Sequence, residues 1–360
     1  MTVKTRRQIK WLNRSCRWTK RHLGWIAISV LLAAQVADVQ AASHPVKASS
    51  SKQDIVLATV GGKAIHTSDF MRYLQGTCSN AEIEALKTNR EARVAALNDY
   101  LDLTALTAKA KKEGIDRTPL YRKACELMEM KILDSMVTER DRSRFTKAAT
   151  VSDRELKAYY DSHPDQFQVQ GGRSPFTEVK GLIEERVTGD KLAKAHKAYL
   201  DPIRAQMHLK ETALAAQSDF HLDWDTPAND GNVLATLNGS PIHESDFKWF
   251  VKDAYRAEQR YQALSRPGSR RSMLTSYLNM RVLEAKARKD GLDKDAGFRA
   301  SRDASQAKLL AEFLQEQDHS APWMLPGSTE EAKAAAYQTY INQLRREVGF
   351  KVAILPHAAR

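Results

Sequence analysis

The sequence predicts a mainly α-helical protein with two repeated helical modules, each carrying a small β element. Two thirteen-residue stretches are closely similar: ATVGGKAIHTSDF at 58–70 and ATLNGSPIHESDF at 235–247. The similarity continues without a gap, at a constant spacing of 177 residues, from Val56 and Val233 to Arg122 and Arg299. Apolar residues recur at helical spacing through most of this length. A gapless match of this length indicates a duplication.

The first 41 residues have the pattern of a secretory signal peptide. Eight Lys and Arg residues precede an apolar run at 25–37, and small residues precede a cut after Ala41. The run is short for a membrane span, so we expect membrane contact only if the signal stays uncleaved. Cleavage lowers the formal net charge from +12 to +5 by removing eight positive charges and one negative charge. We therefore expect a periplasmic or otherwise exported protein that binds no nucleic acid.

Each copy begins with a short β-rich run, VLATV or VLATL, followed by a Gly-Gly or Asn-Gly dipeptide that predicts a tight hairpin turn. A histidine, His66 or His243, then stands three residues before an aspartate, Asp69 or Asp246. This spacing predicts a helix start with a carboxylate at the positive end of the helix. No cluster of His, Cys, Asp and Glu with ligand spacing surrounds either histidine, so we expect no metal, cofactor or catalytic residue there.

Two further helices follow in each copy. The first has an apolar stripe and ends at Gly114 or Gly291. The second carries in copy one the stretch CELMEMKILDSMV, at 125–137. Its methionines either belong to the core or form an adaptable binding surface. Trp249 lies beside the apolar face of its helix, and either packs against the other copy or meets a partner. The tentative binding residues are Trp249, Met128, Met130 and Met136.

Two cysteines, Cys78 and Cys125, remain after cleavage, because Cys16 leaves with the signal peptide. An exported protein meets an oxidising environment, so the two could form a disulfide. The alternative is two separate, half-buried thiols. Their counterparts in the second copy are Tyr255 and Arg302, and the sequence leaves both alternatives open.

The order of these patterns gives the boundaries of the parts. A signal peptide at 1–41 and a linker at 42–54 precede copy one at 55–216, and a linker at 217–232 precedes copy two at 233–356. AYLDPIRAQMHLK, from Ala198, resembles TYINQLRREVGFK, from Thr339, so both copies end with a helix and a short strand. The two ends of a copy could meet at its small β element.

These motifs, in this order, resemble the SurA-type periplasmic chaperones and the chaperone regions of parvulin-bearing foldases such as PrsA and PpiD. In that family, a segment like VSDRELKAYYDSHPDQF leads into a parvulin prolyl-isomerase domain, and a segment like SPFTEVKGLIEERV follows it. Here only seven residues, at 168–174, lie between Phe167 and Pro175. The resemblance therefore implies chaperone modules whose catalytic domain is reduced to a short loop.

The function that this resemblance implies is ATP-independent chaperone activity in the periplasm. Its partners would be unfolded or partly folded exported proteins, including outer-membrane proteins, and we expect no enzyme activity. An alternative is a dedicated accessory protein that binds a subunit of an export or polysaccharide-secretion apparatus. A third hypothesis is a residual peptidyl-prolyl cis-trans isomerase.

Overall fold

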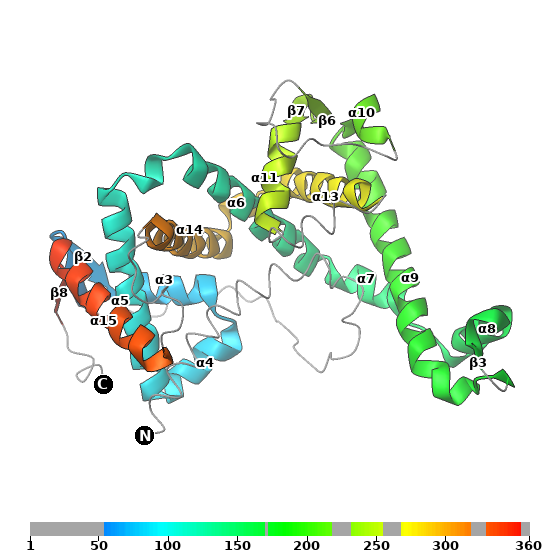
Figure 1. Ribbon diagram of the computed structural model, residues 1–360, viewed down its shortest axis with the longest axis horizontal. Coiled ribbons are helices and arrows are strands. Elements are labelled where there is room, and N and C mark those ends of the chain that lie inside the picture. The colour runs from blue at the N-terminus through cyan, green and yellow to red at the C-terminus, as the bar shows by residue number, and fades with distance from the viewer. Residues whose placement is uncertain (1–53, 170–171, 218–231, 255–267, 318–328, 354–360) are drawn as a thin grey trace. The chain divides into compact units, whose positions relative to one another are not determined.

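The computed structural model describes residues 54–169, 172–217, 232–254, 268–317 and 329–353 (Figure 1). The fold is mainly α-helical with small β elements, as predicted. The chain forms two compact units. Among the described residues, unit 1 comprises 134–286, and unit 2 comprises 54–133 together with 287–353. The signal peptide, its cleavage site and almost all of both linkers lie outside the described residues.

Unit 2 combines the start of the first copy with the later part of the second. It contains β1 (Val56–Val60), β2 (Lys63–His66), α3 (Thr67–Thr77), α4 (Asn80–Thr88), α5 (Arg90–Lys112), the 3-10 helix η1 (Ile115–Arg117), most of α6 (Pro119–Arg140), the end of α13 (Ser269–Lys289), η3 (Leu292–Lys294), α14 (Ala296–Gln317), α15 (Glu330–Glu347) and β8 (Lys351–Val352).

Unit 1 has all of its described residues between residues 134 and 286. It contains the end of α6, α7 (Arg142–Ala149), α8 (Asp153–Ser162), η2 (Pro164–Phe167), β3 (Gln168–Val169), β4 (Gly172–Arg173), α9 (Phe176–Gln206), β5 (Lys210–Glu211), α10 (Ala213–Ala216), β6 (Val233–Leu237), β7 (Ser240–His243), α11 (Glu244–Ala254) and most of α13.

Both predicted hairpin turns are present. Gly61 and Gly62 have φ angles of 56° and 80°, and Asn238 and Gly239 have φ angles of 50° and 83°. Positive φ at both central residues is the requirement of a type I′ turn, which matches the twist of the two strands. The β1–β2 and β6–β7 hairpins share the same register, with an irregularity after the first pair in each.

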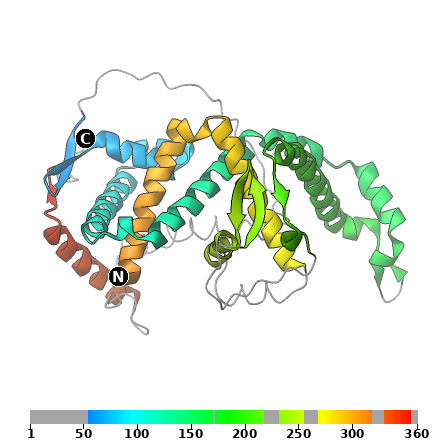
Figure 2. The same ribbon diagram turned by 90° about the horizontal axis from the view of Figure 1, so that it is seen from above.

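The ends of the copies meet across the repeat, so the expectation that the two ends of one copy pair is wrong. The strand order is β2-β1-β8 in unit 2 and β5-β6-β7 in unit 1. β8, the last strand of copy two, thus pairs with the hairpin of copy one, and β5 pairs with the hairpin of copy two (Figure 2). Because β5 is much closer in the chain to β6 than to β1, its closure onto β6 loses less chain entropy.

The exchanged ends make the same contacts in both units. The Gly61 N–H donates to the carbonyl of Val348 at 3.0 Å, and the Asn238 N–H donates to the carbonyl of Met207 at 3.0 Å. The two donors occupy equivalent positions of the repeat, as do the two acceptors. The duplication is therefore visible in the packing as well as in the amino-acid sequence.

Helix exchange accompanies strand exchange in unit 2. α14, the sequence counterpart of α6, packs against α3 and α5 of the first copy. The backbones of α3 and α14 approach closely, since a Cβ added at Gly76 would lie 2.2 Å from the carbonyl oxygen of Ala300. Ala300 and Ala304 are themselves buried. Small residues on both helices therefore permit the crossing.

Apolar side chains around these contacts form the cores. In unit 2, one cluster joins α5, α14 and α15, and a second joins the β1–β2 hairpin to α3 and α5. In unit 1, the rings of Phe247, Phe250 and Tyr277 pack together, with centroid distances of 5.0 to 6.4 Å. A separate small cluster of Leu156, Tyr160, Phe167 and Ile183 lies around α8.

We predict that Gly76→Ala destabilises unit 2 by about 1–3 kcal/mol, because the added methyl group overlaps the backbone of α14. Gly181→Ala in α9 is the matched control: no heavy atom lies within 4 Å of its added Cβ. That change should be neutral or stabilise the helix by up to about 1 kcal/mol. Urea unfolding followed by circular dichroism measures both, and equal midpoints would contradict the close crossing.

Candidate functional site

The four predicted helix-start residues lie where the spacing places them. His66 is the N-cap of α3, and Asp69 Oδ2 accepts from its N–H at 2.9 Å. Asp246 Oδ2 accepts in the same way from His243 N–H, at 3.3 Å. Among the described residues, neither imidazole Nδ1 has a hydrogen-bond partner, and that of His66 lies 3.7 Å from Asp54 Oδ2. The carboxylates rather than the imidazoles therefore cap these helices.

The predicted binding residues differ in exposure. Met130 is buried, with 1% of its surface exposed, so a client contact by this side chain is ruled out in the folded unit. Its burial reflects helical periodicity, which places it on the same face of α6 as Leu127 and Leu133. Met128 and Met136 are half-buried. Trp249 is also half-buried, and Lys252 Nζ lies 5.8 Å from its ring centroid.

The two cysteines are free thiols in the structure, so the disulfide is not formed. Cys78 is the C-cap residue of α3 and packs against the apolar cluster of the β1–β2 hairpin, α3 and α5. Cys125 packs against the other cluster of unit 2, formed by α5, α14 and α15. Burial raises the pKa of both thiols. A raised pKa lowers the thiolate fraction and with it the reactivity of each sulfur.

The described residues contain neither a metal-binding cluster nor a helix that could cross a membrane. Within the ranges given above, no three or more His, Cys, Asp or Glu side chains converge to hold a metal ion. In the same ranges, no helix has the length and the apolar character needed to cross a membrane.

The segment where the resemblance places a catalytic domain is a short β-hairpin. β3 and β4 pair through Gln168 with Arg173 and Val169 with Gly172. The Ser174 N–H donates to the carbonyl of Phe167 at 2.9 Å, so the ends of the seven-residue segment are held together. We call the described residues between 151 and 187, all of which belong to unit 1, the α8 lobe.

Aromatic rings and cations hold the α8 lobe together. The Tyr160 hydroxyl donates to the carbonyl of Ser174 at 2.7 Å, and the ring of Tyr160 packs on Phe167 and Phe176. The Arg173 guanidinium lies 3.6 Å from the Tyr160 ring centroid and donates to the Tyr160 carbonyl. Lys157 Nζ lies 4.9 Å from the same centroid. Cation–π contacts of this kind add to the hydrophobic packing of the buried Tyr160 ring.

A capping box and an ion pair fix the start of α8. Glu155 Oε2 accepts from the Ser152 N–H at 2.9 Å, and Lys191 Nζ of α9 lies 2.6 Å from Glu155 Oε1. The hydrogen bond from Lys191, with those from Ser152, lowers the pKa of Glu155 to about 2. The carboxylate is thus charged at all physiological pH values and joins α8 to α9.

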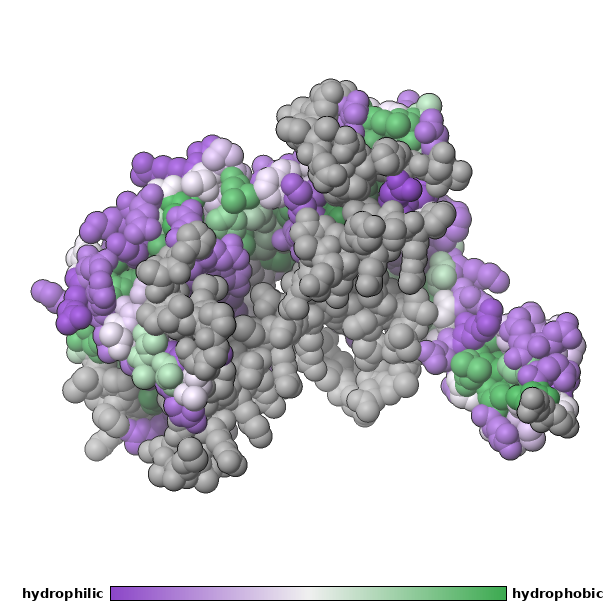
Figure 3. All heavy atoms as spheres, in the orientation of Figure 1, coloured by the Kyte–Doolittle hydropathy of each residue, from purple (hydrophilic) through white to green (hydrophobic). Residues whose placement is uncertain are grey.

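The α8 lobe carries two strongly exposed apolar side chains. Val169 of β3 is 58% exposed, and Leu182 of α9 is 63% exposed. In the space-filling view, apolar side chains gather on the face of the lobe that carries α8 and β3 (Figure 3). We call Val169 and Leu182 the lobe surface. Unit 2 exposes other large apolar side chains, namely Ile55, Met71, Leu120 and Val352.

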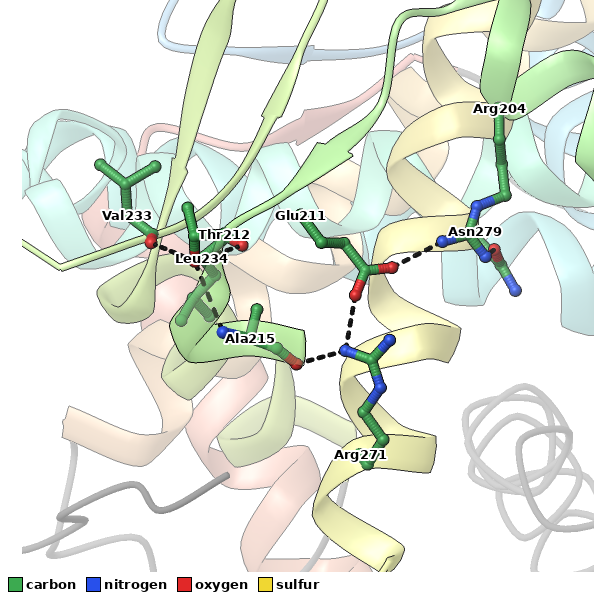
Figure 4. A network of polar contacts seen from close by, with 8 residues as sticks. All are labelled: Arg204, Glu211, Thr212, Ala215, Val233, Leu234, Arg271 and Asn279. Atoms are coloured by element: carbon green, nitrogen blue, oxygen red, sulfur yellow. Dashed lines mark hydrogen bonds and ion pairs between the residues drawn. The ribbon is translucent and has the colours of Figure 1, made fainter. Parts of the chain in front are cut away.

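A charged network fixes the exchanged strand β5 in unit 1 (Figure 4). Glu211 of β5 points between two arginines: Arg204 Nη2 of α9 lies 2.7 Å from Oε1, and Arg271 Nη1 of α13 lies 2.6 Å from Oε2. Arg271 also donates to the carbonyl of Ala215, and Arg204 Nη1 donates to Asn279 Oδ1 at 3.3 Å. The carboxylate thereby joins the end of copy one to the long helix of copy two.

Sequence reasoning missed this network and the lobe surface. Glu211 and Arg271 lie 60 residues apart and match no motif, so no local signal pairs them. Val169 is different, because it stands in the short segment at 168–174 where the sequence departs from the family pattern. That departure was a usable signal for an exposed apolar residue in this segment.

Comparison with known proteins relates part of the chain to an isomerase-named protein. This chain is 28% identical over 149 residues to a Helicobacter pylori protein named "Putative peptidyl-prolyl cis-trans isomerase". The match covers 41% of this chain and 48% of the relative, so the aligned part spans about half the length of that curated protein. No family model matches the chain, and no solved structure matches it. The finer resemblance to SurA-type modules rests on the motifs.

We predict that Glu211→Gln destabilises unit 1 by about 2 kcal/mol, because two half-buried arginines lose a charged partner. Glu185→Gln on the exposed face of α9 is the matched control and should change stability by less than about 0.5 kcal/mol. Urea unfolding of both variants gives the comparison. Equal effects of the two changes would show that the network does not fix β5.

Proposed function

We propose that the protein is an ATP-independent chaperone of exported proteins that binds unfolded or partly folded chains and catalyses no prolyl isomerisation. The observation that carries this proposal is the α8 lobe, which exposes Val169 and Leu182 and in which the paired strands β3 and β4 stand at the expected position of a catalytic domain. The periplasmic location rests on the signal-peptide pattern of the first 41 residues.

The exposed apolar residues support binding to unfolded chains. Large apolar side chains on both units can cover apolar segments of a client, each removing a modest area from water. Several weak contacts on one chain sum to useful affinity, while each single contact releases quickly. Binding the unfolded form lowers its free concentration and so slows aggregation, without any need for a nucleotide.

A second candidate function, peptidyl-prolyl isomerisation, is favoured by the name of the H. pylori relative alone. Catalysis has to lower a barrier of roughly 18–20 kcal/mol for rotation about the amide bond, which requires a shaped pocket around the proline. The hairpin at 168–174 offers seven residues for this purpose. Its described side chains are held in the lobe or point to solvent.

We expect the chain without residues 1–41 to suppress aggregation of an unfolded outer-membrane protein. The double variant Val169→Ser and Leu182→Ser should bind the same client about tenfold more weakly, since each lost apolar contact removes about 0.7 kcal/mol or more. Glu185→Ser, at an exposed site of the same helix, should leave binding unchanged. The readouts are light scattering and fluorescence anisotropy of a labelled client.

Two outcomes contradict this assignment. If the protein leaves aggregation unchanged, and a pull-down yields one stoichiometric band, the accessory-protein hypothesis replaces it. If the double variant binds as tightly as the parent, the lobe surface is not the client contact.

We predict no parvulin-like acceleration in a proline-peptide isomerisation assay, because the chain between Phe167 and Pro175 is too short to build a catalytic pocket. The uncatalysed reaction is the negative control, and a parvulin enzyme is the positive control. A robust rate that disappears on deletion of 168–174 would establish the isomerase hypothesis instead.

A further inference from the structure

Three helices of unit 2 enclose an open cavity of about 660 Å³. Its walls come from α5, from the end of α14 and from α15. Leu314 of α14 and Ala336, Tyr340 and Leu344 of α15 give it apolar surface. Leu314 and Leu344 are also buried members of the cluster with α5, so the core of the unit fixes this wall. The volume lies in the range of ligand pockets in proteins.

Another part of the cavity wall is charged. Lys109 Nζ of α5 lies 3.0 Å from Glu113 Oε1 and 2.7 Å from Glu347 Oε2, and all three side chains line the cavity. The hydrogen bonds from Lys109 and Gln343 lower the pKa of Glu347, so this carboxylate is ionised at neutral pH. Two carboxylates around one ammonium leave a net negative charge beside the apolar wall. A positively charged group is therefore favoured at this place.

Unit 1 shows what packs on the equivalent helix surface. The match of the segment from Ala198 with the segment from Thr339 places Tyr199 of α9 at the position of Tyr340. Phe145 of α7 packs edge-on against Tyr199, with 5.0 Å between the ring centroids. Phe145 is buried in this contact. A helix with one aromatic anchor thus covers, in unit 1, the counterpart of a residue that lines the cavity in unit 2.

The covering helix α7 is basic and amphipathic. Its sequence, RSRFTKAA, contains three cationic side chains and no acidic one. Phe145 and Ala149, four residues apart, are buried, whereas Arg142, Arg144 and Lys147 are exposed. An apolar anchor among exposed cations complements a wall that is partly apolar and partly negative.

The chain does not repeat the sequence of α7 in its second copy. α6 and α14 end at equivalent residues, Arg140 and Gln317. At the spacing of 177 residues, α7 corresponds to 319–326, which reads HSAPWMLP and lies outside the described residues. This stretch has no Lys or Arg, and Pro322 stands at the position of Phe145. The second copy thus keeps the tyrosine of the helix surface without the basic, aromatic sequence that covers it in the first.

We propose that the cavity between α5, α14 and α15 binds a short basic helix of a partner protein, which packs one aromatic side chain against Tyr340 and places a Lys or Arg near Glu113 and Glu347. The aromatic anchor supplies most of the binding energy, and the charges fix the orientation of the helix. This is the helix-in-groove mode of recognition. The site belongs to unit 2, goes beyond the holding of unfolded chains by the lobe surface of unit 1, and does not depend on it.

A labelled peptide of residues 141–150, held helical by a lactam bridge, is the probe, because unit 1 already packs this sequence against α9. Fluorescence anisotropy with the full chain should show saturable binding. Phe145→Ala in the peptide should weaken binding by about tenfold or more, since the anchor is lost. Replacing its three cations by Gln should also weaken binding and remove most of its dependence on salt.

A matched pair of protein variants locates the contact. Ala336→Phe fills the cavity from its own wall and should weaken peptide binding by about tenfold or more. Ala334→Phe, at an exposed position of the same helix, should bind like the parent. Circular dichroism checks that both variants fold. The peptide variants test the parent protein itself, so a folding defect of Ala336→Phe leaves the proposal testable.

A photoreactive phenylalanine in place of Thr339, which lines the cavity, identifies the occupant. A cross-link to the peptide that unlabelled peptide competes away supports the proposal. A cross-link to residues 318–328 of the same chain that persists at saturating peptide would overturn it. So would absence of binding to the parent protein, equal binding by the Ala336→Phe and Ala334→Phe variants, or equal binding of the parent peptide and its Phe145→Ala form.

Discussion

The pairing of each terminal strand with the hairpin of the other copy is the constraint on which both units depend. β8 completes the sheet that begins with β1, and β5 completes the sheet that continues with β6 and β7. In each unit the same backbone hydrogen bond holds this closure: Gly61 N–H donates to the Val348 carbonyl, and Asn238 N–H donates to the Met207 carbonyl. Once the strands are exchanged, the helices that precede them must pack on the other copy, and the cores follow.

Charged side chains adjust this common plan differently in the two units. Unit 1 adds Glu211 between two arginines, so its closing strand is held by charge as well as by the backbone. Unit 2 replaces neutral Ser276 and Asn279 by Asp99 and Asp102, which lie close together in a poorly solvated place. The two units of a duplicated scaffold thus place different charged groups beside equivalent closing helices.

Local features of the fold were predictable from the sequence, because they depend on short-range chemistry. The positive φ angles at Gly61–Gly62 and Asn238–Gly239 follow from the residues alone, as do the helix starts before Asp69 and Asp246. The partner of each terminal strand was not predictable in this way. The two hairpins are nearly identical, so either strand fits either hairpin, and the choice depends on connection lengths and packing. The site was harder still: Met130 lies in the core, and Glu211 pairs across 60 residues.

The interleaved order of the units has a consequence for how the chain folds during synthesis. The described residues of unit 1 all lie within one segment, 134–286, so they have all been synthesised once α13 is made. Unit 2 joins 54–133 to 287–353, so β1, α3 and α5 wait for α14 and β8 while the whole of unit 1 is synthesised. Contacts of such long sequence separation form slowly, because the intervening loop must close first. During that interval the parts of α3 and α5 that α14 covers in the folded unit lack this partner, and such transiently exposed apolar surface favours aggregation.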